Sequence, residues 1–395
     1  MSTREVVVVS GARTAIGDYG GSLKDVAPTR LGAIAIREAV ARAKVDPAAV
    51  GHVVMGSVIH GEARDMYLSR VAAVDAGLPV GTPCLTVNRL CGSGLQAIVS
   101  AAQHILLGDT ELVVGGGAES MSRAAYFLPA ARWGQRMGDE PALDAMTGAL
   151  HDPFGHGHMG VTAENIAAKF GFTREQQDAF ALESHRRAAS AIEKGFFADQ
   201  ITPIEIRTRK GMEKFARDEH VRKDAKAADL QKLKAVFKKD GTVTAGNASG
   251  LNDAGAAIVM CSSEFAKQKN LKPMARLVAY SHAGVEPQVM GLGPIPAVKR
   301  VFEKTGLKPA DMDVIESNEA FAAQAMAVTK DLGLDPAKVN PNGGAVALGH
   351  PIGATGAILT VKALYELQRT QTRYALVTMC IGGGQGIAAI FERLH

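Results

Sequence analysis

The stretch Asn88-Arg89-Leu90-Cys91-Gly92-Ser93-Gly94 marks a step from a short strand into a helix, and the rest of the chain is organised around it. The residues before it, Pro83–Val87, are apolar and partly β-branched, which is typical of a buried strand. The residues after it, Leu95–Leu107, are apolar on almost every face and stop at Gly108. This pattern predicts an enclosed helix that ends at a left-handed glycine, with Cys91 at its first turn.

A cysteine in this position has two interpretations. The unpaired N–H groups and the positive end of the helix dipole favour a thiolate over a thiol, and cysteines at helix N-termini have pKa values of roughly 3.5 to 7.5. Cys91 is equally interpretable as a small buried hydrophobic residue. The flanking glycines allow another backbone or a substrate to approach closely, so both interpretations stay open at this point.

Composition places the chain among ordinary globular proteins. Its 395 residues are 47% hydrophobic and 21% charged, with 43 glycines, which leaves room for two or three domains rich in tight turns. A net charge of +4 gives no reason to expect a nucleic-acid partner. The four cysteines lack C-x-x-C spacing, which argues against a disulfide framework and against a zinc or other metal site. No signal peptide or long apolar span is expected, so the sequence predicts a cytoplasmic protein without a membrane partner.

Apolar strand-like runs alternate with segments of helix length, and this alternation predicts an α/β protein with a mostly parallel sheet and crossover helices. The predicted strands are 6–10, 53–59, 83–87, 112–115, 256–260, 275–279, 314–317, 375–380 and 387–391. The predicted helices are 29–42, 69–76, 95–107, 296–305, 321–332 and 356–367, with Thr29 as the N-cap of the first.

The two ends of the chain resemble each other. Val45–Ser57 aligns with Leu307–Ser317, and Cys91–Gly94 with its helix aligns with Gly353–Gly356 and its helix. Each of these helices is followed by a strand that carries a triple glycine. Several features in the same order indicate a duplicated βα unit and two halves packed face to face, with both apolar helices between their sheets.

The segment between the halves, 122–241, is longer than a connection needs to be, which predicts a separate lid or loop domain. A capping box at Thr173 predicts a helix there. From Arg207 to Lys239, twelve Lys or Arg residues accompany five acids. This excess is compatible with a nucleotide phosphate as ligand, and equally with a solvated charged surface.

Four further stretches are unusual for a structural core: Thr244–Asp253, Ser317–Ala322, Asn340–Gly356 and Met379–Gly386. His350 stands before a proline in the glycine-rich entry to a buried helix. Cys380 ends a strand beside three glycines, where backbone N–H groups can face a ligand.

Together these motifs resemble the thiolase family over essentially the whole chain, specifically the bacterial biosynthetic acetyl-CoA acetyltransferase and β-ketothiolase branch of polyhydroxyalkanoate-making bacteria. The resemblance implies duplicated βαβαβαββ halves that form a five-layer αβαβα sandwich. It implies an N-terminal half over 1–121 completed by 242–271, a loop domain over 122–241, and a C-terminal half over 272–395. It further implies a homotetramer, with an assembly loop near 126–137.

The resemblance also implies a reaction, the joining of two acyl-CoA molecules by Claisen condensation or its thiolytic reversal. Cys91 would carry the acyl group, His350 would take its proton, and Cys380 would remove a proton from the second acetyl-CoA. One oxyanion hole would use His350 and a water held by Asn318, and the other the backbone N–H groups of Cys91 and Gly382.

Coenzyme A and short acyl-CoA or 3-ketoacyl-CoA thioesters are the implied substrates, with no tightly bound cofactor. The residues implied to line the pantetheine and acyl pocket are Leu150, His158, Met159, Phe237, Ala248, Ser249, Met290, Ala320 and Phe321. Arg222 corresponds to a basic residue near the nucleotide end.

Three other functions deserve comparison. A β-ketoacyl synthase would share the fold but place histidines or an asparagine where this chain has Cys380. A dehydrogenase would need G-x-G-x-x-G after the first strand, which this chain lacks. A non-enzymatic CoA-binding protein would have no need to keep Cys91, His350 and Cys380 together.

Overall fold

The computed structural model describes residues 4–209 and 211–394 and builds them around one mixed sheet. In spatial order, the strands of this sheet are β12 (Val314–Ser317), β13 (Tyr374–Ile381), β14 (Gln385–Arg393), β11 (Ala275–Gly284), β1 (Val6–Arg13), β10 (Asn252–Ser262), β5 (Leu112–Ser120), β3 (His52–Gly56) and β4 (Cys84–Val87). The short strand β2 (Gly17–Asp18) pairs with β10.

The strand order confirms the internal duplication. The run β1–β10–β5–β3 in the N-terminal half has the same order and the same strand directions as β11–β14–β13–β12 in the C-terminal half. The two runs join where β1 pairs with β11, through Val7 with Arg276 and Val8 with Ala275. Each half therefore supplies one part of a sheet that bends around the middle of the molecule.

The expectation of a mostly parallel sheet is wrong. Pairing is parallel between β3 and β4, between β3 and β5, and between β12 and β13, whereas the other neighbours in the sheet run antiparallel. Crossover helices account for the parallel pairs. The long strands β10 and β14 return along the sheet in the opposite direction, and a tight turn with positive φ at Gly383 and Gly384 joins β13 to β14.

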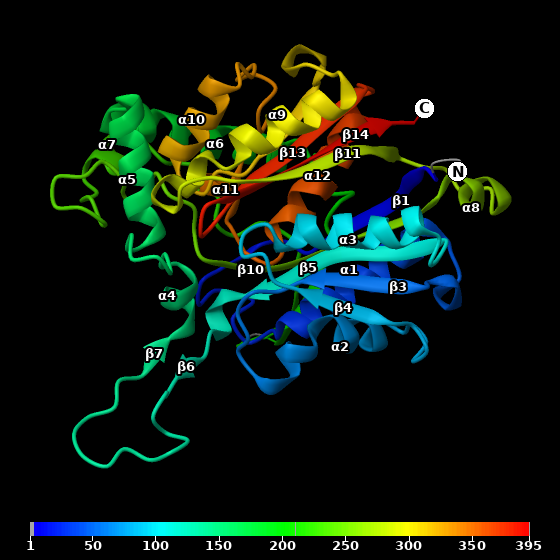
Figure 1. Ribbon diagram of the computed structural model, residues 1–395, viewed down its shortest axis with the longest axis horizontal. Helices are drawn as coiled ribbons and strands as arrows, with labels where there is room; N and C mark the ends of the chain where they lie inside the picture. Colours follow the sequence, from blue (N-terminus) through cyan, green and yellow to red (C-terminus); the bar gives the residue numbers. More distant parts are fainter. Residues whose placement is uncertain (1–3, 210, 395) are drawn as a thin grey trace.

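Helices form three layers around the sheet (Figure 1). The long helices are α1 (Pro28–Ala43), α2 (Leu68–Asp75), α3 (Ser93–Leu107), α9 (Pro294–Thr305), α10 (Ala322–Asp331) and α12 (Thr355–Thr370). Figure 1 shows α3 and α12 between the two parts of the sheet, with α1 and α2 outside one part and α9 and α10 outside the other. This is the five-layer arrangement that the family resemblance implies.

The centre of the molecule is the contact between α3 and α12. Leu95, Ile98, Ile358 and Val361 are buried there in one apolar cluster. The window Leu90–Leu107 has a mean hydropathy of 1.3, so by composition and length this one helix could cross a membrane, but 56% of the window is buried as the core helix. The C-terminal end of α3 reaches the surface, where Leu107 is 78% exposed.

Helix ends test three of the predictions. Gly108 caps α3 with φ of 84°, as predicted. The capping box at Thr173 is confirmed at the start of α6. Thr29 is wrong as an N-cap, because Pro28 occupies the first turn of α1 and makes Ala27 the cap.

The segment 122–241 contains its own elements. They are β6 (Tyr126–Phe127), β7 (Leu143–Asp144), α4 (Ala145–Ala149), α5 (Met159–Phe170), α6 (Arg174–Glu193), β8 (Ile204–Thr208), β9 (Gly211–Phe215) and α7 (Ala227–Gln231). The chain between β6 and β7 extends away from the body (Figure 1). The remaining short helices are η1 (Pro47–Ala49), η2 (Ala63–Tyr67), η3 (Met121–Arg123), α8 (Ser263–Gln268), η4 (Pro287–Leu292), η5 (Pro309–Asp311) and α11 (Ala345–Leu348).

Candidate active site

Cys91 lies in the turn between β4 and α3, two residues before the helix begins at Ser93. The turn is held by Ser93, whose hydroxyl accepts from the Arg89 N–H at 2.8 Å and donates to the Leu90 carbonyl at 2.7 Å. Leu90 has a positive φ of 42°, a conformation uncommon for a leucine. A side chain at Gly94 would place its Cβ 2.7 Å from the backbone nitrogen of Ala357, so the glycine lets α12 approach closely.

Burial determines the protonation state of Cys91. It raises the pKa of the thiol to about 11, although the backbone N–H groups of Gly382 and of Cys91 itself point at the sulfur and lower it. The N–H groups of this turn therefore act on the thiol in the expected direction, but the loss of hydration outweighs them. A thiol of this kind needs a base before it can act as a nucleophile.

His350 lies just beyond α11 and is buried, at 5% exposure. Its backbone N–H donates to Asn252 Oδ1 at 2.9 Å. Its Nδ1 lies 2.6 Å from Thr355 Oγ1, and its Nε2 lies 3.4 Å from Asn318 Nδ2. Burial lowers the pKa of His350 to about 4, so the ring is neutral at pH 7 and can accept a proton.

Asn318 and Cys380 come from neighbouring parallel strands. Asn318 follows β12, where its backbone N–H donates to the Thr378 carbonyl of β13 at 3.0 Å. Cys380 lies on β13 and is fully buried, and both burial and the proximity of Cys91 raise the pKa of its thiol. Parallel neighbours end at one edge of a sheet, which explains why motifs about 60 residues apart in the chain meet here.

Both cysteines and the histidine loop thus converge on one place. Gly382 directs its N–H at the Cys91 sulfur, and Cys91 and Cys380 influence each other electrostatically. Cys91 packs in the same apolar cluster as Ile352, two residues beyond His350. The structure therefore brings Cys91, Gly382 and Cys380 together and places His350 beside Asn318.

Apolar side chains pack around Cys380. One cluster of contacting side chains contains Met159, Phe237, Ala248, Met290, Ala320, Phe321 and Cys380. The remaining predicted lining residues lie beside them. His158 stacks on Phe237 with ring centroids 4.6 Å apart, the Ser249 N–H donates to the Ala320 carbonyl, and the Leu150 carbonyl accepts from the Met159 N–H.

Arg222 lies away from this cluster. It lines a separate cavity of about 650 Å³ with His185, His220, Lys223 and Leu230. Residues of α6, of α7 and of the basic stretch 207–239 line this cavity. The lining places the cations Arg222 and Lys223 beside the acids Asp224 and Asp229, so a phosphorylated ligand would meet two cationic side chains here.

Glu119 is a buried residue of the site that the sequence motifs did not reveal. Its carboxylate accepts from the backbone N–H groups of Val58 at 3.1 Å, Ile59 at 3.1 Å and Gly353 at 2.8 Å. Burial raises its pKa to about 8, against these three hydrogen bonds. Glu119 joins the loop after β3 to the loop that carries His350, and it is one of the groups that raise the pKa of Cys91. The sequence signal was an acidic residue at the end of a glycine-rich strand.

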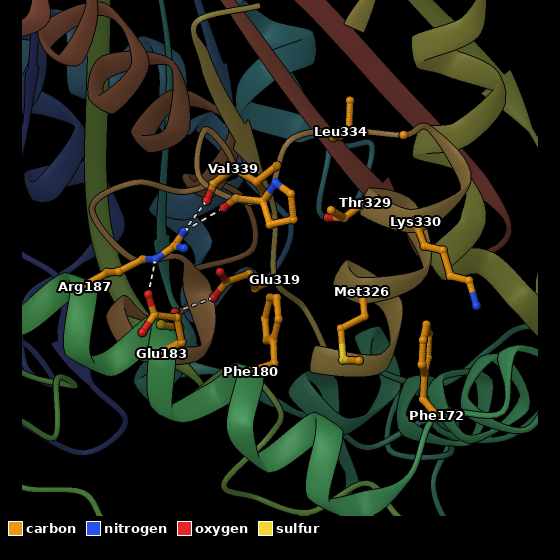
Figure 2. Close-up of a pocket in the computed structure, with 13 residues that line it drawn as sticks. Phe172, Phe180, Glu183, Arg187, Glu319, Met326, Thr329, Lys330, Leu334 and Val339 are labelled. Carbon is orange, nitrogen blue, oxygen red and sulfur yellow. Dashed lines mark hydrogen bonds and ion pairs between the residues drawn. The ribbon is translucent and has the colours of Figure 1, made fainter. Parts of the chain in front are cut away.

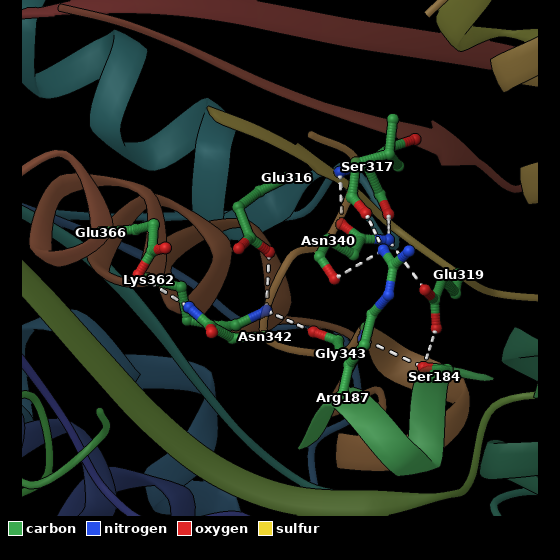
Figure 3. Close-up of polar contacts among 12 residues, drawn as sticks. Ser184, Arg187, Glu316, Ser317, Glu319, Asn340, Asn342, Gly343, Lys362 and Glu366 are labelled. Atoms are coloured by element: carbon green, nitrogen blue, oxygen red, sulfur yellow. Dashed lines mark hydrogen bonds and ion pairs between the residues drawn. The ribbon is translucent and has the colours of Figure 1, made fainter. Parts of the chain in front are cut away.

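A buried polar cluster includes Ser317 and Glu319, the two neighbours of Asn318 in the chain (Figure 3). Asn340 accepts from the Ser317 N–H and donates to both the Ser317 carbonyl and Glu319. Glu319 also accepts from Ser184 Oγ of α6 at 2.7 Å. The cluster thereby ties segment 122–241 to the residues on both sides of Asn318.

The same cluster contains a buried ion pair. Lys362 Nζ of α12 lies 2.6 Å from Glu316 Oε2 and donates to the Gly343 carbonyl at 2.8 Å. Beyond Glu319, a cavity of about 570 Å³ opens between α6 and α10 (Figure 2). Phe172, Phe180, Met326 and Leu334 give it an apolar wall, and the sequence motifs did not predict it.

Comparison with known proteins agrees with this geometry. The family descriptions "Thiolase, N-terminal domain" and "Thiolase, C-terminal domain" match residues 6–264 and 271–393. The chain is 68% identical to Beta-ketothiolase BktB of Cupriavidus necator, over 99% of this chain and 100% of that protein. It is 49% identical to an acetyl-CoA acetyltransferase of Allochromatium vinosum, over 98% and 99% of the two chains.

Solved structures agree as well. Human mitochondrial 3-ketoacyl-CoA thiolase in complex with CoA superposes with a TM-score of 0.96 at 44% identity, covering 100% of this chain and 99% of that one. The Bacillus anthracis acetyl-CoA acetyltransferase gives a TM-score of 0.97 at 47% identity, covering 99% of each chain. The resemblance seen in the sequence motifs is confirmed, and the chain belongs to the thiolase family.

Proposed function

We propose that this thiolase is an acyl-CoA:acetyl-CoA C-acyltransferase. It catalyses the Claisen condensation of acetyl-CoA with a second short acyl-CoA to a 3-ketoacyl-CoA and CoA, and the thiolytic reversal. The observation that carries the proposal is the meeting of two thiols, the partly buried Cys91 and the buried Cys380, with a neutral His350 and the Gly382 N–H. One thiol can carry the acyl group while the other handles a carbon-bound proton.

In the acylation half-reaction, His350 Nε2 takes the proton of Cys91. The thiolate attacks the acyl carbonyl carbon, a new C–S bond forms, and the bond to CoA sulfur breaks. The N–H groups of Cys91 and Gly382 stabilise the negative charge on the carbonyl oxygen by hydrogen bonding. Cys380 gives its proton to the departing CoA thiolate, which leaves an imidazolium at His350 and a thiolate at Cys380.

In the condensation half-reaction, the Cys380 thiolate removes a proton from the methyl carbon of the incoming acetyl-CoA. The enolate oxygen faces the imidazolium N–H and Asn318. The carbanion attacks the acyl carbon on Cys91, and the released Cys91 thiolate recovers its proton from His350. All three groups return to their starting states, so each turnover is balanced.

The test is acetyl transfer to the protein itself. After mixing with acetoacetyl-CoA, intact mass and peptide mapping should find one acetyl group on Cys91, which added CoA removes. Cys91→Ala should show none, and Cys261→Ser is the matched control because Cys261 is a buried thiol on β10. An unmodified wild-type protein, or an acetyl group elsewhere that CoA does not remove, would refute the proposal.

CoA binding is proposed to span two regions. The apolar cluster with Met159 and Met290 takes the acyl and pantetheine portion, and the cavity with Arg222 takes the nucleotide phosphates. Segment 122–241 acts in this proposal as a loop domain that contributes both regions. Arg222→Ala should raise KM for acetoacetyl-CoA and leave kcat/KM for acetoacetyl-pantetheine unchanged. A loss on both substrates would contradict a phosphate contact.

A cytoplasmic homotetramer is proposed as the working form. Support comes from the apolar side chains on the extended chain near β6 and β7, since Trp133 is 87% exposed and Met137 is 90% exposed. Large apolar side chains that are exposed on a monomer and lie together are typical of protein interfaces. Trp133→Glu with Met137→Glu should lower the native mass measured by light scattering. An unchanged mass would remove this loop from the interface.

A further inference from the structure

Thr355 makes a contact that the proposed reaction does not yet use. It is the first residue of α12 and is buried, at 2% exposure. Its Oγ1 lies 2.6 Å from His350 Nδ1 and 2.9 Å from the carbonyl oxygen of Pro351. A hydroxyl carries one proton, so it donates to one of these partners and accepts from the other.

The helix geometry indicates that the Thr355 hydroxyl donates its proton to the carbonyl oxygen of Pro351. Pro351 lies four residues before Thr355, and a threonine hydroxyl in a helix commonly donates to the carbonyl at this spacing. The carbonyl has no hydrogen to give, so this contact forms when the hydroxyl donates. Oγ1 then has lone pairs free for His350, and Nδ1 must carry the hydrogen of that short contact.

The other ring nitrogen points to the same assignment. His350 Nε2 faces Asn318 Nδ2 at 3.4 Å, and an amide nitrogen is a donor. Nε2 therefore carries a lone pair. The contacts of both ring nitrogens therefore indicate the same tautomer, with hydrogen on Nδ1 and none on Nε2.

We propose that Thr355 is a positioning residue that holds His350 in the Nδ1–H tautomer throughout the reaction, so that Nε2 alone receives and returns the proton of Cys91. The inference rests on the proposed function. When Nε2 takes the proton, the S–H bond of Cys91 breaks, an N–H bond forms, and the Nδ1–H bond to Thr355 stays in place. The same Nε2–H then faces the substrate oxygen and later returns to Cys91, so Thr355 accepts a hydrogen bond in every state.

The magnitude follows from the burial of the ring. Without Oγ1, the Nδ1–H of a buried imidazole loses its acceptor, and leaving such a donor unsatisfied corresponds to about a 10- to 100-fold effect. The substitution is expected to lower the rate of acyl transfer, because Thr355 is not a member of the apolar cluster around Cys380. KM is therefore expected to stay unchanged.

The experiment compares two substitutions at Thr355 with one on the same helix. Thr355→Val keeps the shape and removes the hydroxyl, whereas Thr355→Ser keeps the hydroxyl. Thr360→Val is the matched control, because Thr360 Oγ1 makes the same type of bond to the Gly356 carbonyl at 2.8 Å, is fully buried, and is not bonded to a histidine. The measurements are kcat and KM for acetyl-Cys91 formation and the rate of Cys91 alkylation by iodoacetamide at pH 7.5.

Thr355→Val is expected to lower both rates about 10- to 100-fold at unchanged KM, with Thr355→Ser and Thr360→Val within about threefold of wild type. Thr355→Ala replaces the valine variant if the latter does not fold. Wild-type rates in the valine variant would overturn the proposal, as would a serine variant as slow as the valine one. A wild-type enzyme that alkylates but never acetylates would instead refute the proposed function, and the alkylation rates would still test Thr355.

Discussion

Replacing Lys362 by methionine should destabilise the protein by about 3–5 kcal/mol at pH 8, because removing one partner of a buried ion pair leaves an uncompensated charge. The side chains of Lys362 and Glu316 are 2% and 0% exposed, and Nζ lies 2.6 Å from Oε2. Figure 3 shows Lys362 between Glu316 and Gly343. Methionine fills a similar volume, so the loss comes from the charge left on Glu316 and from the Gly343 carbonyl left without its donor.

The loss should depend on pH. Burial raises the pKa of Glu316 from 4.5 to about 7 even with Lys362 present, and removing the ammonium raises it further. A carboxyl with a raised folded-state pKa contributes stability that is lost as pH rises through that pKa. The difference in unfolding free energy between the variant and wild type should therefore be largest above pH 8. It should become smaller as the pH falls towards 6.

Guanidinium unfolding at fixed protein concentration measures the effect, with equal m-values required for the comparison. Lys299→Met is the control, because Lys299 and Asp331 form a 2.8 Å pair whose side chains are 55% and 35% exposed. That variant should lose at most about 1 kcal/mol. Adding Glu316→Leu to Lys362→Met should restore most of the stability. A Lys362→Met protein within about 1 kcal/mol of wild type at pH 8 would refute the reasoning.

Cys380→Ser should still acetylate Cys91 but condense at least about 100-fold more slowly, because a hydroxyl is a far weaker base towards carbon. Condensation at the wild-type rate would make the role of Cys380 wrong. Asn318→Ala should slow condensation about 10²–10³-fold, measured by single-turnover kinetics with preformed acetyl-enzyme. Equal losses in both half-reactions would contradict a specific role for Asn318. Gly382→Val should slow acetylation while leaving the protein folded by circular dichroism, because a Cβ at residue 382 would lie 2.9 Å from Leu90 Cδ1 and displace the N–H group. An acetylation rate equal to that of wild type would contradict a role for Gly382 in the site.

The motifs predicted the members of the site better than they predicted its chemistry. Cys91 and Cys380 stand beside glycines at the ends of strands, and His350 stands in the glycine-rich loop before α12, which are signals visible in one sequence. The support behind them is not visible, since Glu119, Asn252 and Thr355 act through contacts between distant segments. Strand direction also escaped prediction, because β10 and β14 have the same apolar pattern whichever way they run.

The largest difference between sequence and structure concerns the charge of Cys91. A helix N-terminus is a local feature, whereas the desolvation that raises its pKa to about 11 comes from the packing of both halves around it. Burial also lowers the pKa of His350 to about 4, so transfer of the proton from Cys91 to Nε2 is uphill. The pair is therefore uncharged at pH 7, and the thiolate forms only as its proton passes to Nε2.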